Sequence, residues 1–140
     1  MDSHFSTTRR VAFRDTDAAG IMHFSVFFTW MEDAEHELLR HLGLSVSTRD
    51  SEGEISWPRV AAQCDFKSPI KFENEVTITV QLDRLGEKSA TYTFRFVHQQ
   101  REVALGSLTA VCCRIPSGGT PSSIAIPDAI GKKLRSLLKK

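Results

Sequence analysis

The chain lacks the features that mark metal-binding, disulfide-stabilised or membrane-spanning proteins. Its three cysteines, Cys64, Cys112 and Cys113, are odd in number, and their spacing matches neither a zinc site nor a disulfide framework. No apolar run approaches the length of a membrane span, and the first segment, MDSHFSTTRR, lacks the apolar core of a signal peptide. We therefore expect a cytoplasmic protein with reduced cysteines.

Charge of one sign is not in excess either. The 18 basic and 17 acidic side chains leave a formal charge of +1, so no overall field attracts nucleic acid or a membrane surface. An anionic ligand must then be met by local groups. The chain has 140 residues and is 41% hydrophobic, which is enough for one domain with a substantial core. We predict a single domain over residues 1–140.

One long helix is predicted within SVFFTWMEDAEHELLRHLG, residues 25–43. Apolar residues recur there at three- and four-residue spacing, Ser25 can cap the start, and Gly43 follows the end. Phe28, Trp30 and Leu39 widen the apolar face, which indicates that protein surrounds most of the helix. We expect Trp30, Met31 and the phenylalanines of this chain to be core residues.

Alternating apolar and polar residues predict a sheet around this helix. Val60, Ala62, Cys64 and Phe66 share one face of a segment that is typical of a half-buried strand. The predicted strands are residues 8–14, 60–67, 75–86, 88–98 and 102–115. The order of one strand, one helix and four strands predicts an α+β domain with a curved antiparallel sheet of about five strands.

Residues 116–140 are predicted to form a loop and then a short amphipathic helix. The loop is rich in glycine, proline and serine, and apolar residues recur at helical spacing after Pro127. Basic residues in this tail suit a membrane surface or a phosphate site, but the narrow apolar face favours docking on the sheet edge. They are Lys132, Lys133, Arg135, Lys139 and Lys140.

The segment FRDTDAAGIMHFS places Asp15 and Asp17 between the first strand and the helix. Free amides at the helix start lie close to whichever aspartate faces inward. Such amides can hold the oxyanion that forms when a carbonyl is attacked, so carboxylate and amides together suffice for hydrolysing an activated acyl group. Loop capping by the two aspartates is the alternative. A metal between them is disfavoured because no third ligand follows at a matching spacing.

The segment DTDAAGIMHFSVFFTWMEDAEHELLRHLG resembles the signature of the 4-hydroxybenzoyl-CoA thioesterase group of hotdog-fold proteins. The similarity rests on Asp-x-Asp-x-x-Gly, on the pair His23 and Phe24, and on the helix that runs to Leu-Gly. Weaker similarity continues through CDFKSPIKFENEV and LGEKS to the last strand, so it covers nearly the whole chain. It implies a hotdog fold in which two chains pair their sheets and the active site lies at the dimer interface.

The resemblance also implies roles for single residues. Asp17 is then the catalytic carboxylate, which attacks the thioester carbon or activates a water, while Asp15 bonds the loop. Gly20 permits the turn and the close approach of substrate. The amides near His23 and Phe24 form the oxyanion site. Relatives often carry an aromatic residue followed by tyrosine or histidine at these two positions, so His23 is either a substrate contact or a core or interface group.

Lys88 matches the basic turn that meets the CoA phosphates in this family, and Arg84 lies nearby; both could instead be solvated turn residues. CoA enters as part of the substrate, and no separate cofactor is expected. The expected protein is an acyl-CoA thioesterase acting as a homodimer or homotetramer, without a nucleic-acid or membrane partner.

Two other functions remain open at this point. One is a non-catalytic module that binds an acyl thioester. The other is a dehydratase or hydratase of acyl thioesters, which needs a histidine paired with a carboxylate.

Overall fold

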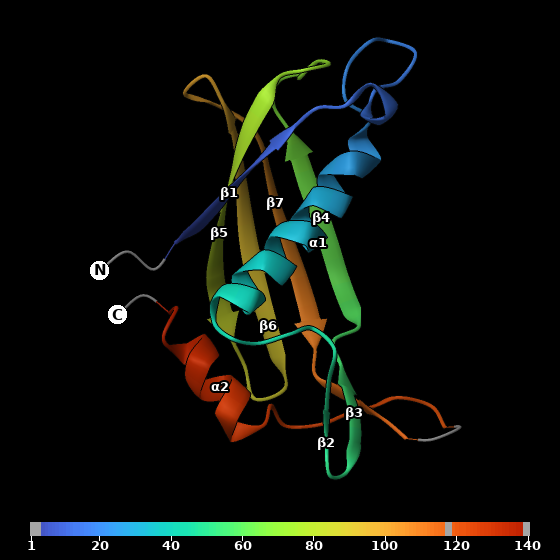
Figure 1. Cartoon of the computed structure of the whole chain (residues 1–140), viewed down its shortest axis with the longest axis vertical. Helices are drawn as coiled ribbons and strands as arrows, with labels where there is room; N and C mark the ends of the chain where they lie inside the picture. Colours follow the sequence, from blue (N-terminus) through green and yellow to red (C-terminus); the bar gives the residue numbers. More distant parts are fainter. Residues whose placement is uncertain (1–3, 117–118, 139–140) are drawn as a thin grey trace.

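The computed structural model describes residues 4–116 and 119–138. Its main sheet is antiparallel, has the strand order β1-β5-β6-β7-β4, and curves around helix α1 (Phe24–His41) (Figure 1). The strands of this sheet are β1 (Phe5–Arg10), β4 (Arg59–Phe66), β5 (Glu75–Leu85), β6 (Ser89–His98) and β7 (Arg101–Val111). One long helix packed on a five-stranded antiparallel sheet confirms the predicted α+β class.

The core lies between α1 and the inner face of the sheet. Strands β5 and β6 alternate as predicted, because every second side chain turns toward the helix. Helix α1 buries Phe27, Trp30, Met31, Ala34, Leu38 and Leu39 against them. The strands contribute Val76, Ile78, Val80, Leu82, Tyr92, Phe94 and Phe96.

Helix α1 begins one residue earlier than predicted, and Ser25 is not its cap. His23 is the N-cap residue, with extended backbone dihedrals, and its ring Nδ1 accepts the N–H of Ser25. A side-chain acceptor at this place satisfies one of the amides that the first helical turn leaves free. At the other end, Gly43 has a φ of 77° and follows the last helical residues as predicted.

Strand β4 forms as predicted, but it is more exposed than the half-buried strand that was expected. Val60 is 61% exposed and Phe66 is 49% exposed. Phe66 pairs with Ala104 and Cys64 with Gly106, so the predicted apolar face does point to the helix side of the sheet. Much of it stays exposed because β4 is the edge strand, which has a neighbouring strand on one side only, even though α1 contacts it.

The ends of the sheet differ from the prediction. Residues 13–15 form a single 3-10 turn, η1, so the first strand ends earlier than expected. The predicted last strand is divided, because the chain leaves the main sheet at Cys112 and joins a second one of order β2-β3-β8-β9. The strands of the second sheet are β2 (Thr48–Asp50), β3 (Gly53–Ser56), β8 (Cys113–Ile115) and β9 (Ser122–Ser123).

The chain ends in helix α2 (Asp128–Arg135), which lies at the opposite end of the molecule from η1 (Figure 1). Leu134 is fully buried, and α2 contacts β5. Lys139 and Lys140, which the prediction included in this basic tail, lie outside the described residues. Among the residues described, no helix is long and apolar enough to cross a bilayer.

Candidate active site

The loop between β1 and α1 is held together by its own two aspartates. Asp15 Oδ2 accepts the N–H of Ala12 at 2.8 Å, and Asp17 Oδ1 accepts the N–H of Ala19 at 2.8 Å. Gly20 donates its N–H to the Asp17 carbonyl and has a φ of 80°, a left-handed conformation that favours glycine. Loop capping thus accounts for the Asp15 carboxylate and for one oxygen of Asp17. Within the described part of the chain, the other Asp17 oxygen has no hydrogen-bond partner.

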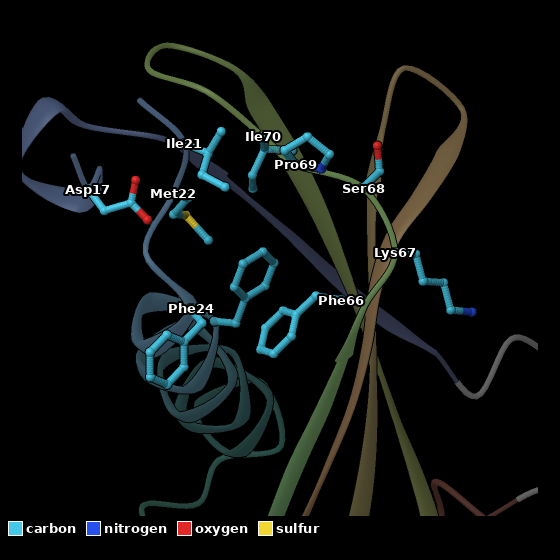
Figure 2. Close-up of a pocket in the computed structure, with 10 residues that line it drawn as sticks. Asp17, Ile21, Met22, Phe24, Phe66, Lys67, Ser68, Pro69 and Ile70 are labelled. Carbon is cyan, nitrogen blue, oxygen red and sulfur yellow. The ribbon is translucent and has the colours of Figure 1, made fainter. Parts of the chain in front are cut away.

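A pocket of about 440 Å³ opens beside this loop, and Asp17 lines it. Figure 2 shows the Asp17 carboxylate turned toward the space in front of Met22, whereas the side chain of Lys67 points away from the pocket. Lys67 instead pairs with Glu102 on β7. The other lining residues are Ile21, Met22, Phe24, Phe27, Phe66, Ser68, Pro69 and Ile70. Asp17 is therefore a carboxylate at the mouth of a mostly apolar pocket.

Aromatic rings form one wall of the pocket. The Phe24 and Phe66 rings meet edge to face at 6.4 Å, and Phe66 meets Phe27 at 5.1 Å in the same manner. Phe27 is 4% exposed and belongs to the core as expected, but Phe24 is 60% exposed. The expectation that the phenylalanines are core residues is therefore wrong for four of them, Phe13, Phe24, Phe66 and Phe72, which are all exposed. Phe24 and Phe66 form an exposed aromatic surface beside the pocket.

The backbone amides around the start of α1 donate hydrogen bonds, with one exception. Met22 donates its N–H to the Ile70 carbonyl at 2.7 Å, and His23 donates its N–H to the Asp15 carbonyl at 2.8 Å. The Ser25 N–H reaches His23 Nδ1 at 3.2 Å. Among the described residues, nothing accepts the N–H of Phe24. Of the two amides expected near His23 and Phe24, that of Phe24 is the one available to an oxyanion.

His23 contributes its side chain to the helix rather than to the pocket lining. Its Nδ1 lies 2.8 Å from Ser25 Oγ as well as near the Ser25 N–H, and its ring stacks on Phe24 at 4.6 Å. Sequence reasoning missed this cap because serine is the commoner N-cap residue and stood two positions later. These contacts join His23 to Ser25 and Phe24, whereas the dehydratase alternative needs a histidine paired with a carboxylate.

Lys88 and Arg84 do not join Asp17 within one chain. Lys88 lies in the turn between β5 and β6, where its carbonyl accepts the N–H of Cys112. The Asp17 loop lies at the other end of the sheet, where Glu73 donates its N–H to the Val11 carbonyl. Strand β5 has 11 residues between these ends, a length of roughly 33 Å. The structure thus separates the two groups of predicted site residues.

Comparison with known proteins assigns the chain to a family. Residues 11–134 match the model of the thioesterase-like superfamily. The chain belongs to this superfamily. The match confirms the resemblance seen in the segment around Asp17, and the fold is the hotdog fold of thioester hydrolases.

Proteins similar to this chain include several that are named as thioester hydrolases. A 1,4-dihydroxy-2-naphthoyl-CoA hydrolase from Synechococcus sp. (strain WH7803) is 32% identical, over 97% of this chain and 92% of the relative. The structure of a gentisyl-coenzyme A thioesterase is 30% identical, with a TM-score of 0.79 over 93% of this chain and 99% of the other. A Thermus thermophilus protein at 24% identity reaches a TM-score of 0.84 over 98% of this chain and 99% of its own, which concerns the fold alone.

Cysteine chemistry does not suit this thioesterase-like chain. Burial raises the pKa of the Cys64 thiol to about 11, with a smaller effect from Asp65. Burial likewise raises the pKa of Cys112 to about 11. A thiol acts as a nucleophile only when it is deprotonated. Neither of these two cysteines lines the pocket, whereas Asp17 does.

Proposed function

We propose that this protein hydrolyses an acyl-CoA thioester to a free acid and CoA, with Asp17 as its catalytic carboxylate. The observation that carries the proposal is that two residues lining one pocket each have a group without a hydrogen-bond partner among the described residues: Asp17 has an oxygen, and Phe24 has its N–H. One group can deliver a nucleophile, and the other can stabilise the negative charge that develops on the carbonyl oxygen.

The reaction is as follows. The thioester carbonyl accepts a hydrogen bond from the Phe24 amide, which polarises its carbon. Asp17 either attacks this carbon or takes a proton from a water that attacks it. The carbon–sulfur bond then breaks, and the thiolate of CoA leaves with a proton derived from water. In the water route this step gives the carboxylic acid directly. In the nucleophilic route the acyl group is left on Asp17 as a mixed anhydride, which a water hydrolyses to release the acid and restore the carboxylate. Both routes consume one water and need no metal or redox partner.

We propose an aromatic acyl group as the substrate class. The relatives at 30–32% identity are named for dihydroxynaphthoyl-CoA and gentisyl-CoA, both of which carry an aromatic acyl group. The edge-to-face rings of Phe24, Phe66 and Phe27 support the proposal, because aromatic faces and edges bind a planar ring favourably.

We further propose a homodimer that pairs β4 with β4 of a second copy in antiparallel orientation. The exposed apolar residues Val60 and Phe66 lie on this edge strand, and an open apolar edge favours strand pairing. Antiparallel pairing sets the Asp17 end of one chain beside the Lys88 end of the other. Lys88 and Arg84 would then serve the CoA phosphates of the partner's substrate, which resolves their separation within one chain.

The decisive test is thioester hydrolysis by the purified protein over a panel of aromatic, short-chain and long-chain acyl-CoAs. We expect turnover of aromatic members and a loss of at least about a hundredfold in kcat for Asp17→Asn. Asp15→Asn is the matched control: it removes the same charge two residues away but keeps an acceptor for the Ala12 N–H, so its kcat should stay close to that of the wild type.

Three outcomes contradict the proposal in different ways. Equal rates for Asp17→Asn and the wild type would remove Asp17 from the chemistry. Preference for a long aliphatic chain would exclude the aromatic substrate class. Tight binding of acyl-CoAs without turnover would favour the non-catalytic binding module.

The CoA site has its own test. Lys88→Ala should raise KM for acyl-CoA by about fivefold to tenfold, because it removes a charge-assisted contact to phosphate. Hydrolysis of the same acyl group on pantetheine, which has no adenosine phosphates, should not change. Arg10→Ala, on the sheet edge opposite β4, is the control cation. An equal effect of Lys88→Ala on both substrates would argue against phosphate binding.

A further inference from the structure

We propose that His23 is a positioning residue whose neutral imidazole fixes the Phe24 amide, so that protonation of the ring slows hydrolysis. The inference rests on the proposed function, since it concerns the same site. It starts from the contact between His23 Nδ1 and the Ser25 N–H at 3.2 Å. Among the described residues, no other group accepts this amide, so Nδ1 is the acceptor that caps α1.

The peptide group that carries the Phe24 N–H is anchored on both sides. Before it, His23 donates its own N–H to the Asp15 carbonyl at 2.8 Å. After it, the Ser25 N–H reaches Nδ1, and the Val26 N–H reaches the His23 carbonyl at 3.1 Å. Because the His23 carbonyl and the Phe24 N–H belong to one planar peptide, these bonds set the direction of the free N–H.

Protonation removes one of these anchors. A neutral imidazole carries its proton on one nitrogen and accepts with the other, so the cap requires the proton on Nε2. The imidazolium ion donates from both nitrogens and cannot accept the Ser25 N–H. It also places a positive charge at the helix end where the dipole disfavours it. The stack of His23 on Phe24 tolerates either state, so the cap is the contact that acid breaks.

Other charged groups lie on the segments packed at this corner of the fold, and they have to be separated from His23 in any pH profile. They are Arg14 and Asp15 on η1, Asp17 on the loop that follows, and Lys67 and Lys71 between β4 and β5. Carboxylates titrate at lower pH than imidazoles, and lysines at much higher pH. A variant at His23 alone therefore separates the effect of the imidazole from the effects of these groups.

The experiment compares His23→Asn with His23→Ala across pH. Asparagine is a strong N-cap residue that does not titrate, whereas alanine has no acceptor. We expect His23→Ala to lower kcat about tenfold with little change in KM, because the amide is displaced but not removed. His23→Asn should recover most of that loss. Its profile should lack the acid limb that protonation of the imidazole is expected to produce in the wild type.

Two controls keep the interpretation specific. His98→Asn changes the last residue of β6, which does not line the pocket and whose Nδ1 contacts the Glu75 carbonyl, and should keep the wild-type pH profile. Ser25→Ala removes the hydroxyl but keeps the N–H, so it should keep the limb as well. Loss of the limb in Ser25→Ala would mean that the ring pairs with the hydroxyl, and this would overturn the proposed cap.

Nitrogen NMR of the imidazole supplies a readout that does not depend on turnover. We expect His23 in the Nε2–H tautomer at neutral pH and loss of Ser25 amide protection in His23→Ala. An Nδ1–H tautomer, or an acid limb that persists in His23→Asn, would overturn the inference. If the protein shows the expected tautomer but hydrolyses no thioester, the proposed function is overturned, and with it the role of His23 in catalysis. The cap of α1 by His23 would still stand.

Discussion

Glu35 is a buried carboxylate that the proposed reaction does not use. Its side chain is 2% exposed on α1, and both of its oxygens accept hydrogen bonds from the Arg59 guanidinium on β4, one of them at 3.0 Å. Burial raises the pKa of Glu35 above its ordinary 4.5, although the hydrogen bonds and the charge of Arg59 act in the opposite direction. The pair joins the helix to the edge strand at some distance from the Asp17 loop.

Arg59→Met is expected to cost about 3 kcal/mol of unfolding free energy at neutral pH, because it leaves a buried carboxylate without its partner. This loss of unfolding free energy should be smaller at acidic pH. An acid whose pKa is raised by folding binds more protons in the folded chain than in the unfolded chain. The free energy of unfolding therefore falls as the pH rises from 4.5 to the pKa of the folded state. Removing Arg59 raises that pKa further and widens this range.

Urea denaturation of the wild type and Arg59→Met at mildly acidic and at alkaline pH measures this effect. The double variant Arg59→Met/Glu35→Leu is the control, since removing both partners of a buried pair is often nearly neutral. A destabilisation of Arg59→Met that does not depend on pH would show that lost packing, rather than the unpaired charge, is the cause.

Single residues also mark how far the sequence could be interpreted. The Asp-x-Asp-x-x-Gly spacing indicated both aspartates and a turn at Gly20, and only the resemblance to a known family distinguished Asp17 from Asp15. It could not show that Asp17 divides its oxygens between the loop and the pocket, nor that His23 caps α1, since both depend on side-chain rotamers. Glu35 and Arg59 are 24 positions apart, so no local pattern connects them.

At the scale of elements, helix α1 and strand β7 approach closely at Gly106. A Cβ at this position would lie 2.5 Å from Met31 Sδ and 3.1 Å from the Gln63 carbonyl oxygen. Met31 is fully buried, so its sulfur has little room to move away. The glycine therefore sets how near the helix lies to the sheet.

Gly106→Ala is expected to destabilise the fold by about 1–3 kcal/mol through overpacking. Replacing Met31 by the shorter valine in the same chain should recover part of this loss, although Met31→Val alone should be destabilising because it opens a cavity. Thermal or urea unfolding of the two single variants and the double variant gives the coupling between them. Strict additivity would show that the two positions do not compete for space.

The residue patterns predicted the positions of β5 and β6 well, because both strands are central in the sheet and have one buried face. The same alternation in β4 predicted a half-buried strand, but most of β4 is exposed in the single chain. Alternation shows which face of a strand is apolar, but it does not show whether another element covers that face. The β2–β3 hairpin was missed, since its strands have only three and four residues and carry no clear alternation. The division of the last strand at Cys112 leaves no local signal either.

For the whole molecule, the proposed dimer predicts that activity depends on assembly. Val60→Asp puts a charge on a residue that is 61% exposed in the single chain, so the monomer should fold as before. Light scattering after size exclusion should find a dimer for the wild type and a monomer for Val60→Asp. The monomer should lose at least about tenfold in kcat/KM for acyl-CoA, because the partner's basic turn is no longer beside the pocket.

Ala125→Asp, which charges an exposed apolar residue outside β4, is the matched control and should remain dimeric and active. A wild-type protein that is monomeric and fully active at assay concentration would contradict both the dimer and the shared CoA site. Full activity of a monomeric Val60→Asp variant would leave the proposed wild-type dimer standing, but it would show that catalysis does not depend on the dimer.

The open edge at β4 has a consequence for how the protein is made. A newly folded chain exposes unpaired backbone groups beside apolar side chains until a second copy arrives, and such an edge also accepts strands from unrelated unfolded chains. Asp65 puts a charge near one end of the strand, whereas Arg59 at the other end is paired with Glu35, so the rest of the strand is open to wrong partners. Expression at a level too low for prompt assembly should therefore favour chaperone capture and aggregation over soluble yield.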